Sequence, residues 1–278
     1  MGAADVDDVA AWIAAEVPAA AAGTEQRGDE VVFWVPRAEV AGVLVQTREL
    51  IARWRVDPAR VRSAEAVPEA EWRDAWKRYF RITRVTRQFV IVPSWERFEA
   101  GPDDVAIALD PGMAFGTGTH ASTRLVLEEL QALADAGGVP ARVLDVGCGS
   151  GILAIAAALR WPGATCEAID VDPLAVAATA ENAAGNGVAA RIAASATPVE
   201  DVREQFPIVL ANIQAHVLRQ LMAALIARVA PGGTLILSGL LTPQAAPLAD
   251  ELVAAGMRLV HVRASEADRE WSVAVLAA

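Results

Sequence analysis

Apolar and polar positions alternate in a regular rhythm from about residue 103 to residue 277. Short, nearly continuous apolar runs take turns with longer stretches in which apolar residues recur at helical spacing. We expect strands at 105–110, 142–147, 165–172, 191–196, 206–212 and 234–240, helices at 117–137, 151–161, 173–187 and 217–233, and an antiparallel hairpin at 257–277. Repeated βα units predict an α/β fold with a parallel, doubly wound sheet, whose ligands bind beyond the carboxyl ends of its strands.

Two of these helices carry recognisable end signals. The helix at 117–137 is expected to begin at a Thr or Ser cap and to end at Gly137. The helix at 173–187 has Pro173 at its first position and a glycine at its end.

The first 68 residues show a different, shorter pattern. A helix-like segment at 6–20, a strand at 31–36, a second helix at 38–54 and a weak extended piece around Val61 predict a small α/β domain. We therefore divide the chain into an N-terminal domain at 1–68, a connection at 69–88 and a larger domain at 89–278. Five of the eight tryptophans, at positions 12, 34, 54, 72 and 76, are assigned to core in preference to a recognition surface, because Trp is mostly buried.

The connection carries a basic run made of Lys77, Arg78, Arg81, Arg84 and Arg87. Such a run could contact an acidic partner or RNA. A solvated face, or pairing with the carboxylates of this acidic chain, is the favoured interpretation.

Composition narrows the class of protein. The apolar runs stay well below the roughly 20 residues that a membrane span needs, and the N-terminus lacks a basic leader segment, so we expect a cytoplasmic protein without membrane contact. The formal charge of −11 argues against direct nucleic-acid recognition and favours a basic protein partner. Two cysteines, Cys148 and Cys166, predict neither a disulfide framework nor a metal site. We expect a monomer.

The glycine-rich segment from Gly147 to Gly151 is the main candidate binding loop. Its Gly147-Cys148-Gly149-Ser150-Gly151 spacing departs from the dinucleotide pattern G-x-G-x-x-G, and Asp145 precedes it on the predicted strand. A carboxylate there would repel a pyrophosphate but would suit a cofactor with a cationic end. S-adenosyl-L-methionine, with its amino group and sulfonium, is such a cofactor.

An acid at the end of the next strand supports the same cofactor. Asp170 terminates the apolar run and can accept hydrogen bonds from both ribose hydroxyls. Asp172 is a rival for this role, but a cap on the helix that begins at Pro173 suits it better. Acid, glycine loop, helix, strand and second acid together indicate a class I methyltransferase.

Two further stretches carry a specific resemblance. LDPGMAFGTGTHASTRLVLEEL at 109–130 and VLANIQAHVL at 209–218 resemble the bacterial methyltransferases of the eleventh protein of the large ribosomal subunit, and the similarity extends from Val90 to Leu241. The resemblance implies a seven-stranded Rossmann-like domain that methylates this ribosomal protein, free or on the ribosome, at its N-terminal α-amine and lysine side chains. It also implies that the small N-terminal domain recognises the substrate, although residues 1–85 match loosely.

The resemblance also implies the cofactor contacts, carried over by motif. They are Thr123, Gly147, Asp170 and Asn212, with Phe115, Gly116 and Thr117 closing over the cofactor; Asp145 and Gly149 join them from the loop pattern. The sequence departs from the family at Gln214, where a leucine is common, and this change either alters how the substrate amine is seated or is neutral.

Methyl transfer requires a neutral amine in line with the methyl group. Asn212 ends the strand at 206–212, so its side-chain oxygen and the Ile213 carbonyl can accept hydrogen bonds from that amine, although neither is a base. The alternative role for Asn212 is a helix cap. His120 is a candidate base but is more often a structural residue at such a helix start, Trp95 either contacts substrate or fills the domain junction, and Cys148 is expected to be inert.

Three rival functions remain at this stage. The first is a similar methyltransferase acting on another protein or a small amine. The second is an NAD-dependent oxidoreductase, which would have G-x-G-x-x-G without the preceding acid. The third is a silent binding module, against which the retention of Asp145, Asp170 and Asn212 argues.

Overall fold

The computed structural model describes residues 13, 17, 25–27, 30–33, 35, 39–53, 56–63, 81–110, 120–266 and 269–278. The chain divides into two compact units, Met1–Lys77 and Arg78–Ala278. This division falls inside the connection expected at 69–88, while the substrate-recognition role of the first unit stays a prediction. The five N-terminal tryptophans, together with Lys77 and Arg78, lie outside the described residues.

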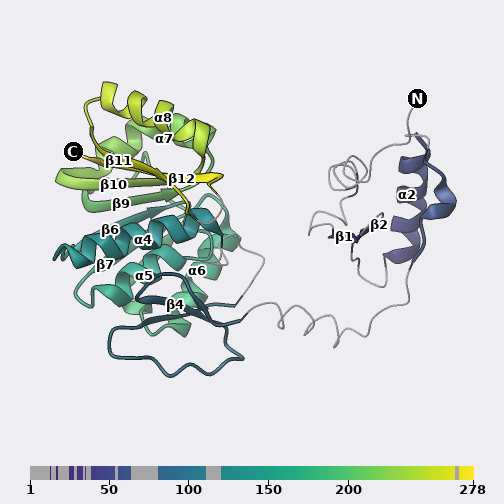
Figure 1. The fold of residues 1–278 in the computed structure, drawn as a ribbon, viewed down its shortest axis with the longest axis horizontal. Helices are drawn as coiled ribbons and strands as arrows, with labels where there is room; N and C mark the ends of the chain where they lie inside the picture. The colour runs from purple at the N-terminus through teal and green to yellow at the C-terminus, as the bar shows by residue number, and fades with distance from the viewer. Residues whose placement is uncertain are drawn as a thin grey trace. The chain divides into compact units, whose positions relative to one another are not determined.

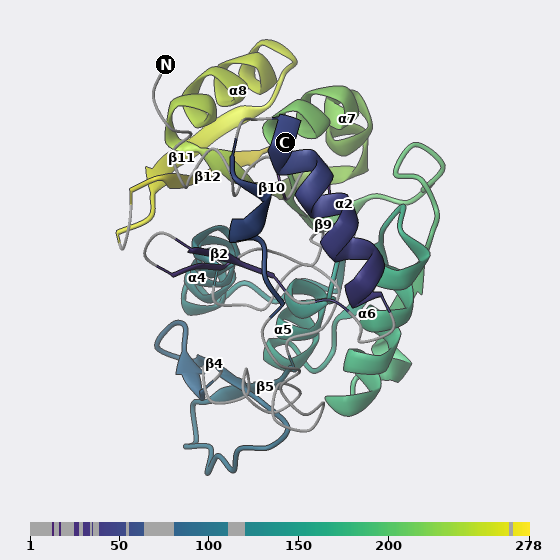
Figure 2. The ribbon, with the colours of Figure 1, turned by 90° about the vertical axis from the view of Figure 1, so that its right-hand side faces the viewer.

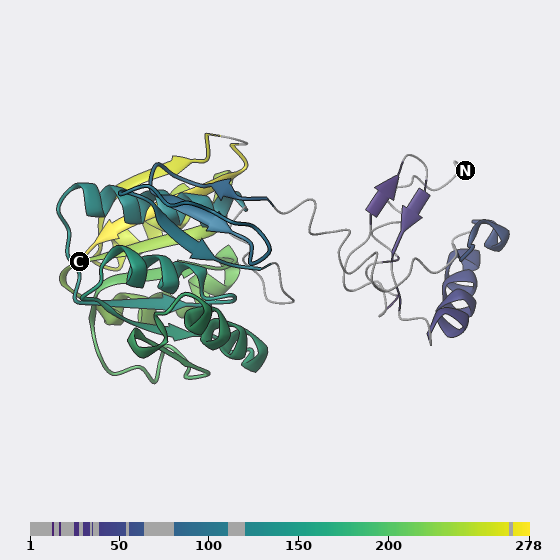
Figure 3. The ribbon, with the colours of Figure 1, turned by 90° about the horizontal axis from the view of Figure 1, so that it is seen from below.

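The described residues of the first unit form a two-stranded antiparallel sheet and a long helix. Strands β1 (Glu25–Arg27) and β2 (Glu30–Val32) pair in Figure 3, and α2 (Val40–Arg53) is followed by a short 3-10 helix, η2 (Pro58–Arg60). A small core joins Ile13, Val17 and Leu50, with Val31, Phe33 and Val43 packed against it. The helix expected at 38–54 is present as Val40–Arg53, whereas the strand expected at 31–36 is observed only over Glu30–Val32.

The second unit is built on a seven-stranded sheet with the order β11-β12-β10-β9-β6-β7-β8 (Figure 1). Its strands are β6 (Arg142–Val146), β7 (Thr165–Ile169), β8 (Ile192–Ser195), β9 (Phe206–Asn212), β10 (Val229–Leu241), β11 (Arg258–Ala264) and β12 (Trp271–Ala277). Only β12 runs antiparallel to its two neighbours, β10 and β11. The expected Rossmann-like sheet with an antiparallel C-terminal hairpin is confirmed.

Helices cover both faces of this sheet, as Figures 1 and 2 show. They are α4 (Ala121–Asp135), α5 (Ile152–Arg160), α6 (Pro173–Gly185), α7 (Ala215–Arg228) and α8 (Thr242–Ala254), with the short η4 (Ala189–Arg191) before β8. Successive residues of a strand enter different cores. Val143 packs with α4 and α5, whereas Leu144 packs with α7 and α8. Because strands such as β9 are buried on both faces, their sequences are nearly continuously apolar.

A separate three-stranded sheet lies at the start of this unit. It consists of β3 (Thr83–Arg84), β4 (Phe89–Val92) and β5 (Val105–Ala108) in that order, and β4 and β5 run parallel. Phe89, Ile91 and Ile107 join the same core as α4 and α5, so this sheet belongs to the second unit and not to the first one. The strand expected at 105–110 is present as β5, but it lies in this separate sheet and not in the seven-stranded one.

The basic run beside this sheet is paired with acids of the same chain. Arg84 binds Asp104 at 2.7 Å, Arg81 binds Glu96 at 3.0 Å and Arg87 binds Asp135 at 2.8 Å. These exposed pairs add little stability, but they agree with the preferred interpretation for the three described members of this run. Within the described part of the chain, no helix is long and apolar enough to cross a bilayer.

Candidate functional site

The candidate site lies at the carboxyl ends of β6, β7, β9 and β10, which are adjacent and parallel. In a doubly wound sheet this edge is where ligands bind. It gathers Asp145, Asp170 and Asn212 from three different strands or strand ends, together with the glycine loop that follows β6.

The glycine loop adopts a backbone that favours glycine at three positions. Gly147, Gly149 and Gly151 have φ values of 72°, 54° and 78°, a left-handed region in which a Cβ is strained. A Cβ on Gly151 would also lie 2.7 Å from Cγ2 of Thr179 on α6. The loop therefore packs closely on α6 and begins α5 without a side-chain cap.

Asp145 lies entirely beneath this loop. Its side chain is fully buried, and its Oδ2 accepts a hydrogen bond from the Ala154 amide in the first turn of α5 at 3.1 Å. The other oxygen, Oδ1, is buried and has no hydrogen-bond partner within the described chain. Burial raises the pKa of Asp145 to about 7; the Asp170 charge adds to the rise and the Ala154 amide opposes it.

This placement refines the expected role of Asp145. The sequence suggests a carboxylate that faces the ligand, whereas the structure covers it completely with the loop. A ligand on the loop would interact with the Asp145 carboxylate through the protein interior, where electrostatic interactions are stronger than in water.

The structure separates the roles of the two acids after β7. Asp172 is the N-cap of α6, and its Oδ1 accepts from the Leu174 amide at 2.8 Å, as the helix-cap interpretation expects. Asp170 instead accepts from the Gly149 amide at 2.9 Å and from the Asp172 amide at 3.0 Å. Asp170 is thus bonded to the glycine loop, whereas Asp172 is bonded to the start of α6.

Asn212 and Thr123 are brought together although they are far apart in sequence. The Asn212 Nδ2 donates to Thr123 Oγ1 at 3.2 Å, and Thr123 is fully buried in the first turn of α4. This bond fixes the orientation of the carboxamide. Its Oδ1 is then left buried, with no hydrogen-bond partner among the residues that the structure describes. A buried acceptor without a donor is costly, so this oxygen is a candidate for binding an N–H group of a ligand.

Sequence reasoning missed Ser238, which supports this pair from β10. Ser238 lies beside Asn212 in the parallel register, is fully buried, and donates from Oγ to the Ser122 carbonyl at 3.0 Å. It ties the first turn of α4, and hence Thr123, to the sheet. A serine inside the apolar strand TLILSGL was the available signal.

The cap of α4 differs from the expectation. The helix begins at Ala121 and is capped by His120, whose Nδ1 accepts from the Ser122 amide at 3.2 Å, so a Thr or Ser cap is wrong. The His120 ring lies edge-on to Trp271 at 4.6 Å between centroids. The packed ring holds Nδ1 where the oxygen of an ordinary cap would lie, which agrees with a structural role for His120.

The remaining candidates have simpler outcomes. Cys148 is buried with its Sγ 3.3 Å from Thr179 Oγ1, and burial raises the pKa of its thiol to about 12; its lack of a chemical role stays a prediction. Trp95 lies half-buried in the turn after β4, and its role stays a prediction. Phe115, Gly116 and Thr117 lie outside the described residues.

A cavity of about 280 Å³ opens at Gln214, which follows Ile213 in the chain, and at Gly239 of β10. It lies between the N-terminal ends of α7 and α8 and the start of β12. Its lining residues are Gln214, Ala215, His216, Arg219, Gly239, Leu241, Gln244 and Trp271. Gln214 is the N-cap residue of α7 but makes no side-chain cap bond. Arg219 is paired with Glu251 at 2.9 Å. The cavity therefore combines the polar groups of Gln214, Gln244 and the paired Arg219 with apolar walls.

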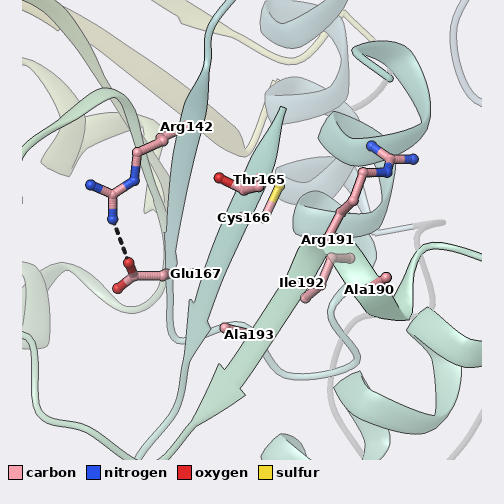
Figure 4. A pocket seen from close by; sticks show the side chains of 8 residues that line it. All are labelled: Arg142, Thr165, Cys166, Glu167, Ala190, Arg191, Ile192 and Ala193. Carbon is pink, nitrogen blue, oxygen red and sulfur yellow. Dashed lines mark hydrogen bonds and ion pairs between the residues drawn. The ribbon is translucent and has the colours of Figure 1, made fainter. Parts of the chain in front are cut away.

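A second cavity, of about 220 Å³, lies at the opposite edge of the sheet, near the start of β6 and β7 (Figure 4). Its polar groups hold the fold together: Arg142 pairs with Glu167 at 2.6 Å, and Arg191 donates to the Ala158 carbonyl near the end of α5. Burial raises the pKa of the Cys166 thiol to about 12. This cavity lacks the buried acceptors found at the other edge, so we assign it no ligand.

Comparison with known proteins gives one consistent result. The family model described as ribosomal protein L11 methyltransferase matches residues 7–277. A relative of that name from Geobacter metallireducens is 47% identical over 204 residues, covering 73% of this chain and 65% of the relative. One from Geobacter sulfurreducens is 41% identical over 247 residues, covering 87% and 79%. The chain therefore spans somewhat less than two thirds of the first of these relatives.

A solved structure agrees with the sequence relatives. The ribosomal protein L11 methylase from Lactobacillus delbrueckii subsp. bulgaricus superposes with a TM-score of 0.62 at 32% identity, covering 71% of this chain and 98% of that one.

Proposed function

The chain belongs to the ribosomal protein L11 methyltransferase family, and from this premise we propose that it transfers methyl groups from S-adenosylmethionine to amines of ribosomal protein L11. The proposed acceptors are the N-terminal α-amine and lysine side chains. The observation that carries the proposal is the buried, unpartnered Oδ1 of Asn212 at the carboxyl edge of the sheet, held in place by Thr123.

The residues present fit the cofactor. Glycines with positive φ at 147, 149 and 151 let a ligand approach the backbone, and Asp170 at the end of β7 can accept ribose hydroxyls. The buried Asp145 charge favours a cationic ligand over a pyrophosphate. When bound, S-adenosylmethionine supplies an electrophilic methyl group on a sulfonium.

The work of the protein is to present a neutral amine. A lysine with a pKa of about 10.4 costs roughly 4 kcal/mol to deprotonate near pH 7.5, whereas an α-amine with a pKa near 8 costs under about 1 kcal/mol. Asn212 Oδ1 and the Ile213 carbonyl accept hydrogen bonds from the amine and aim its lone pair at the methyl group. Neither group takes the proton, so the amine enters neutral or releases the proton to water.

Charge and shape support a protein substrate. The formal charge of −11 attracts a basic ribosomal protein. The cavity at Gln214 offers room for the substrate segment next to the amine, with the carboxamide of Gln214 available to a peptide backbone. We assign recognition of the rest of the substrate to the unit Met1–Lys77.

Incubation of the protein with labelled S-adenosylmethionine and purified large-subunit proteins tests this function. We expect label on L11 alone, at its N-terminus and on lysines, as located by mass spectrometry. Label on a different protein or on a small amine would support methyl transfer from S-adenosylmethionine but would refute L11 as the substrate. Binding of NAD in place of S-adenosylmethionine, measured by calorimetry, would overturn both.

Gln214→Leu tests the substrate cavity. Because Gln214 lines the cavity and makes no cap bond, we expect the KM for L11 to change by about threefold to tenfold, with cofactor affinity and melting temperature nearly unchanged. Steady-state kinetics at saturating cofactor measure this effect. Gln205→Leu, whose side chain contacts the end of α7 far from the cavity, serves as the control. An unchanged KM in Gln214→Leu would show that the substrate does not enter this cavity.

A further inference from the structure

Ile213 is enclosed by two glycines that come from opposite sides of the site. Gly147 belongs to the loop after β6, and Gly239 belongs to β10. Both have positive φ, 72° and 76°, and at both positions an added Cβ would collide with Ile213. The closeness of the two contacts shows that neither glycine can be replaced without moving Ile213 or its surroundings.

The contact with Gly147 involves the side chain of Ile213. A Cβ on Gly147 would lie 2.4 Å from Ile213 Cγ2. This methyl group cannot easily turn away, because β-branched side chains are stiff at χ1 and Ile213 packs against the core beneath α7 and α8. The position of the loop and the position of the Ile213 side chain are therefore linked.

The contact with Gly239 involves the backbone of Ile213. A Cβ there would lie 2.6 Å from the Ile213 carbonyl oxygen, 2.9 Å from its carbon and 3.0 Å from its nitrogen. The pairing of β10 with β12 shifts register between Leu237 and Leu240, while the pairing of β10 with β9 ends at Ser238 and Asn212. This irregularity places Gly239 directly against the peptide unit that follows Asn212.

We propose that Ile213 is a positioning residue that couples the cofactor loop to the groups that receive the substrate amine. Gly239 fixes the place of the Ile213 carbonyl, and Gly147 transmits any change in the loop to the Ile213 side chain. The inference rests on the proposed function and adds to it that cofactor and substrate sites are linked through this residue. A ligand that fixes the conformation of the loop then also fixes the position of the Ile213 carbonyl. The substrate is therefore expected to bind more tightly after the cofactor has bound.

The Gly147 contact is tested by a double-mutant cycle read on cofactor affinity. Gly147→Ala is expected to weaken S-adenosylmethionine binding by tenfold or more. Ile213→Ala removes Cγ2, so the double variant is expected to bind S-adenosylmethionine at least threefold more tightly than Gly147→Ala alone. Gly232→Ala is the matched control, because Gly232 has the same φ of 72° on β10 and nothing within 4 Å of its added Cβ. Additive effects in the cycle, or an equal loss in the control, would overturn the coupling.

The Gly239 contact predicts the opposite pattern. Gly239→Ala is expected to lower kcat by tenfold or more while cofactor affinity changes less than threefold, and Ile213→Ala should give no rescue because the collision is with backbone. Rescue by Ile213→Ala, or a kcat equal to that of Gly232→Ala, would refute the assignment. If Gly239→Ala does not fold, the Gly147 cycle decides alone.

The proposed function can fail separately. The cycle needs only the full chain and S-adenosylmethionine, so it remains decisive even if L11 receives no label. Preference of L11 for the cofactor-loaded protein, measured with S-adenosylhomocysteine present or absent, completes the test. Equal affinity in both states would contradict the linkage.

Discussion

Replacing Asn212 by alanine is expected to lower the rate of methyl transfer by about a hundredfold or more. The change removes the buried Oδ1 acceptor and the Nδ2 bond to Thr123, so the amine loses a group that aligns it, and small misplacements of reacting atoms cost on the order of a hundredfold. Single-turnover kinetics at saturating cofactor and L11 measure the effect on the transfer step.

Asn186→Ala is the matched control for this variant. Asn186 is also a hydrogen-bonded asparagine, but it joins the end of α6 to β5 through the Ala108 amide and carbonyl. We expect it to lower stability by about 1–2 kcal/mol without changing the transfer rate. If Asn212→Ala transfers methyl groups within threefold of the parent protein, the acceptor groups must lie elsewhere.

Replacing Asp145 by asparagine is expected to weaken cofactor binding and to stabilise the cofactor-free protein at the same time. Because electrostatic interactions are strengthened when water is excluded, removal of this charge should raise the cofactor Kd by on the order of tenfold or more at pH 8. Calorimetry measures this loss. Asp250→Asn, an exposed change on α8, controls for the net charge.

The stability gain follows from the raised pKa of Asp145, from 3.8 to about 7. Between these values the folded protein holds a proton that the unfolded chain has released, so this group makes the parent less stable as pH rises from about 4 to 7. The difference corresponds to roughly 4 kcal/mol, from which the burial of an extra amide donor removes about 1–3 kcal/mol. We expect the asparagine variant to melt higher than the parent at pH 8 and no higher than the parent near pH 4.

Thermal unfolding at several pH values decides this point. A constant difference in melting temperature between the two proteins from pH 4 to pH 8 would mean that Asp145 is not the titrating group. Loss of cofactor affinity without any gain in stability would mean that the carboxylate is not desolvated. The expected result is weaker cofactor binding together with higher stability in Asp145→Asn. Asp145 would then be a binding-site group that destabilises the cofactor-free protein.

Much of the fold followed from the sequence because its signals are local and periodic. The strands of the large sheet have apolar runs that only burial on both faces explains, and the cap at Asp172 follows from an acid just before Pro173. The cap at His120 could not be predicted in this way, since histidine is not a favoured cap and depends here on packing against Trp271 from β12.

Part of the candidate site could also be predicted from the sequence. Asp145, Asp170 and Asn212 each end or nearly end an apolar run, and carboxyl ends of parallel strands meet at one edge. The link between Asn212 and Thr123 joins residues 89 positions apart, and the support from Ser238 depends on strand order. Such contacts leave no periodic trace in one sequence.

The sequence by itself therefore determined the alternation of strands and helices, the glycine loop and the acids at the strand ends, because each is set by a short range of neighbouring residues. Only the tertiary structure decided that Asp145 is covered and half-titrated near pH 7, that Asn212 keeps a buried acceptor, and that Ile213 is enclosed by two glycines. These properties depend on which distant groups exclude water and fill space around an atom, and packing alone fixes them.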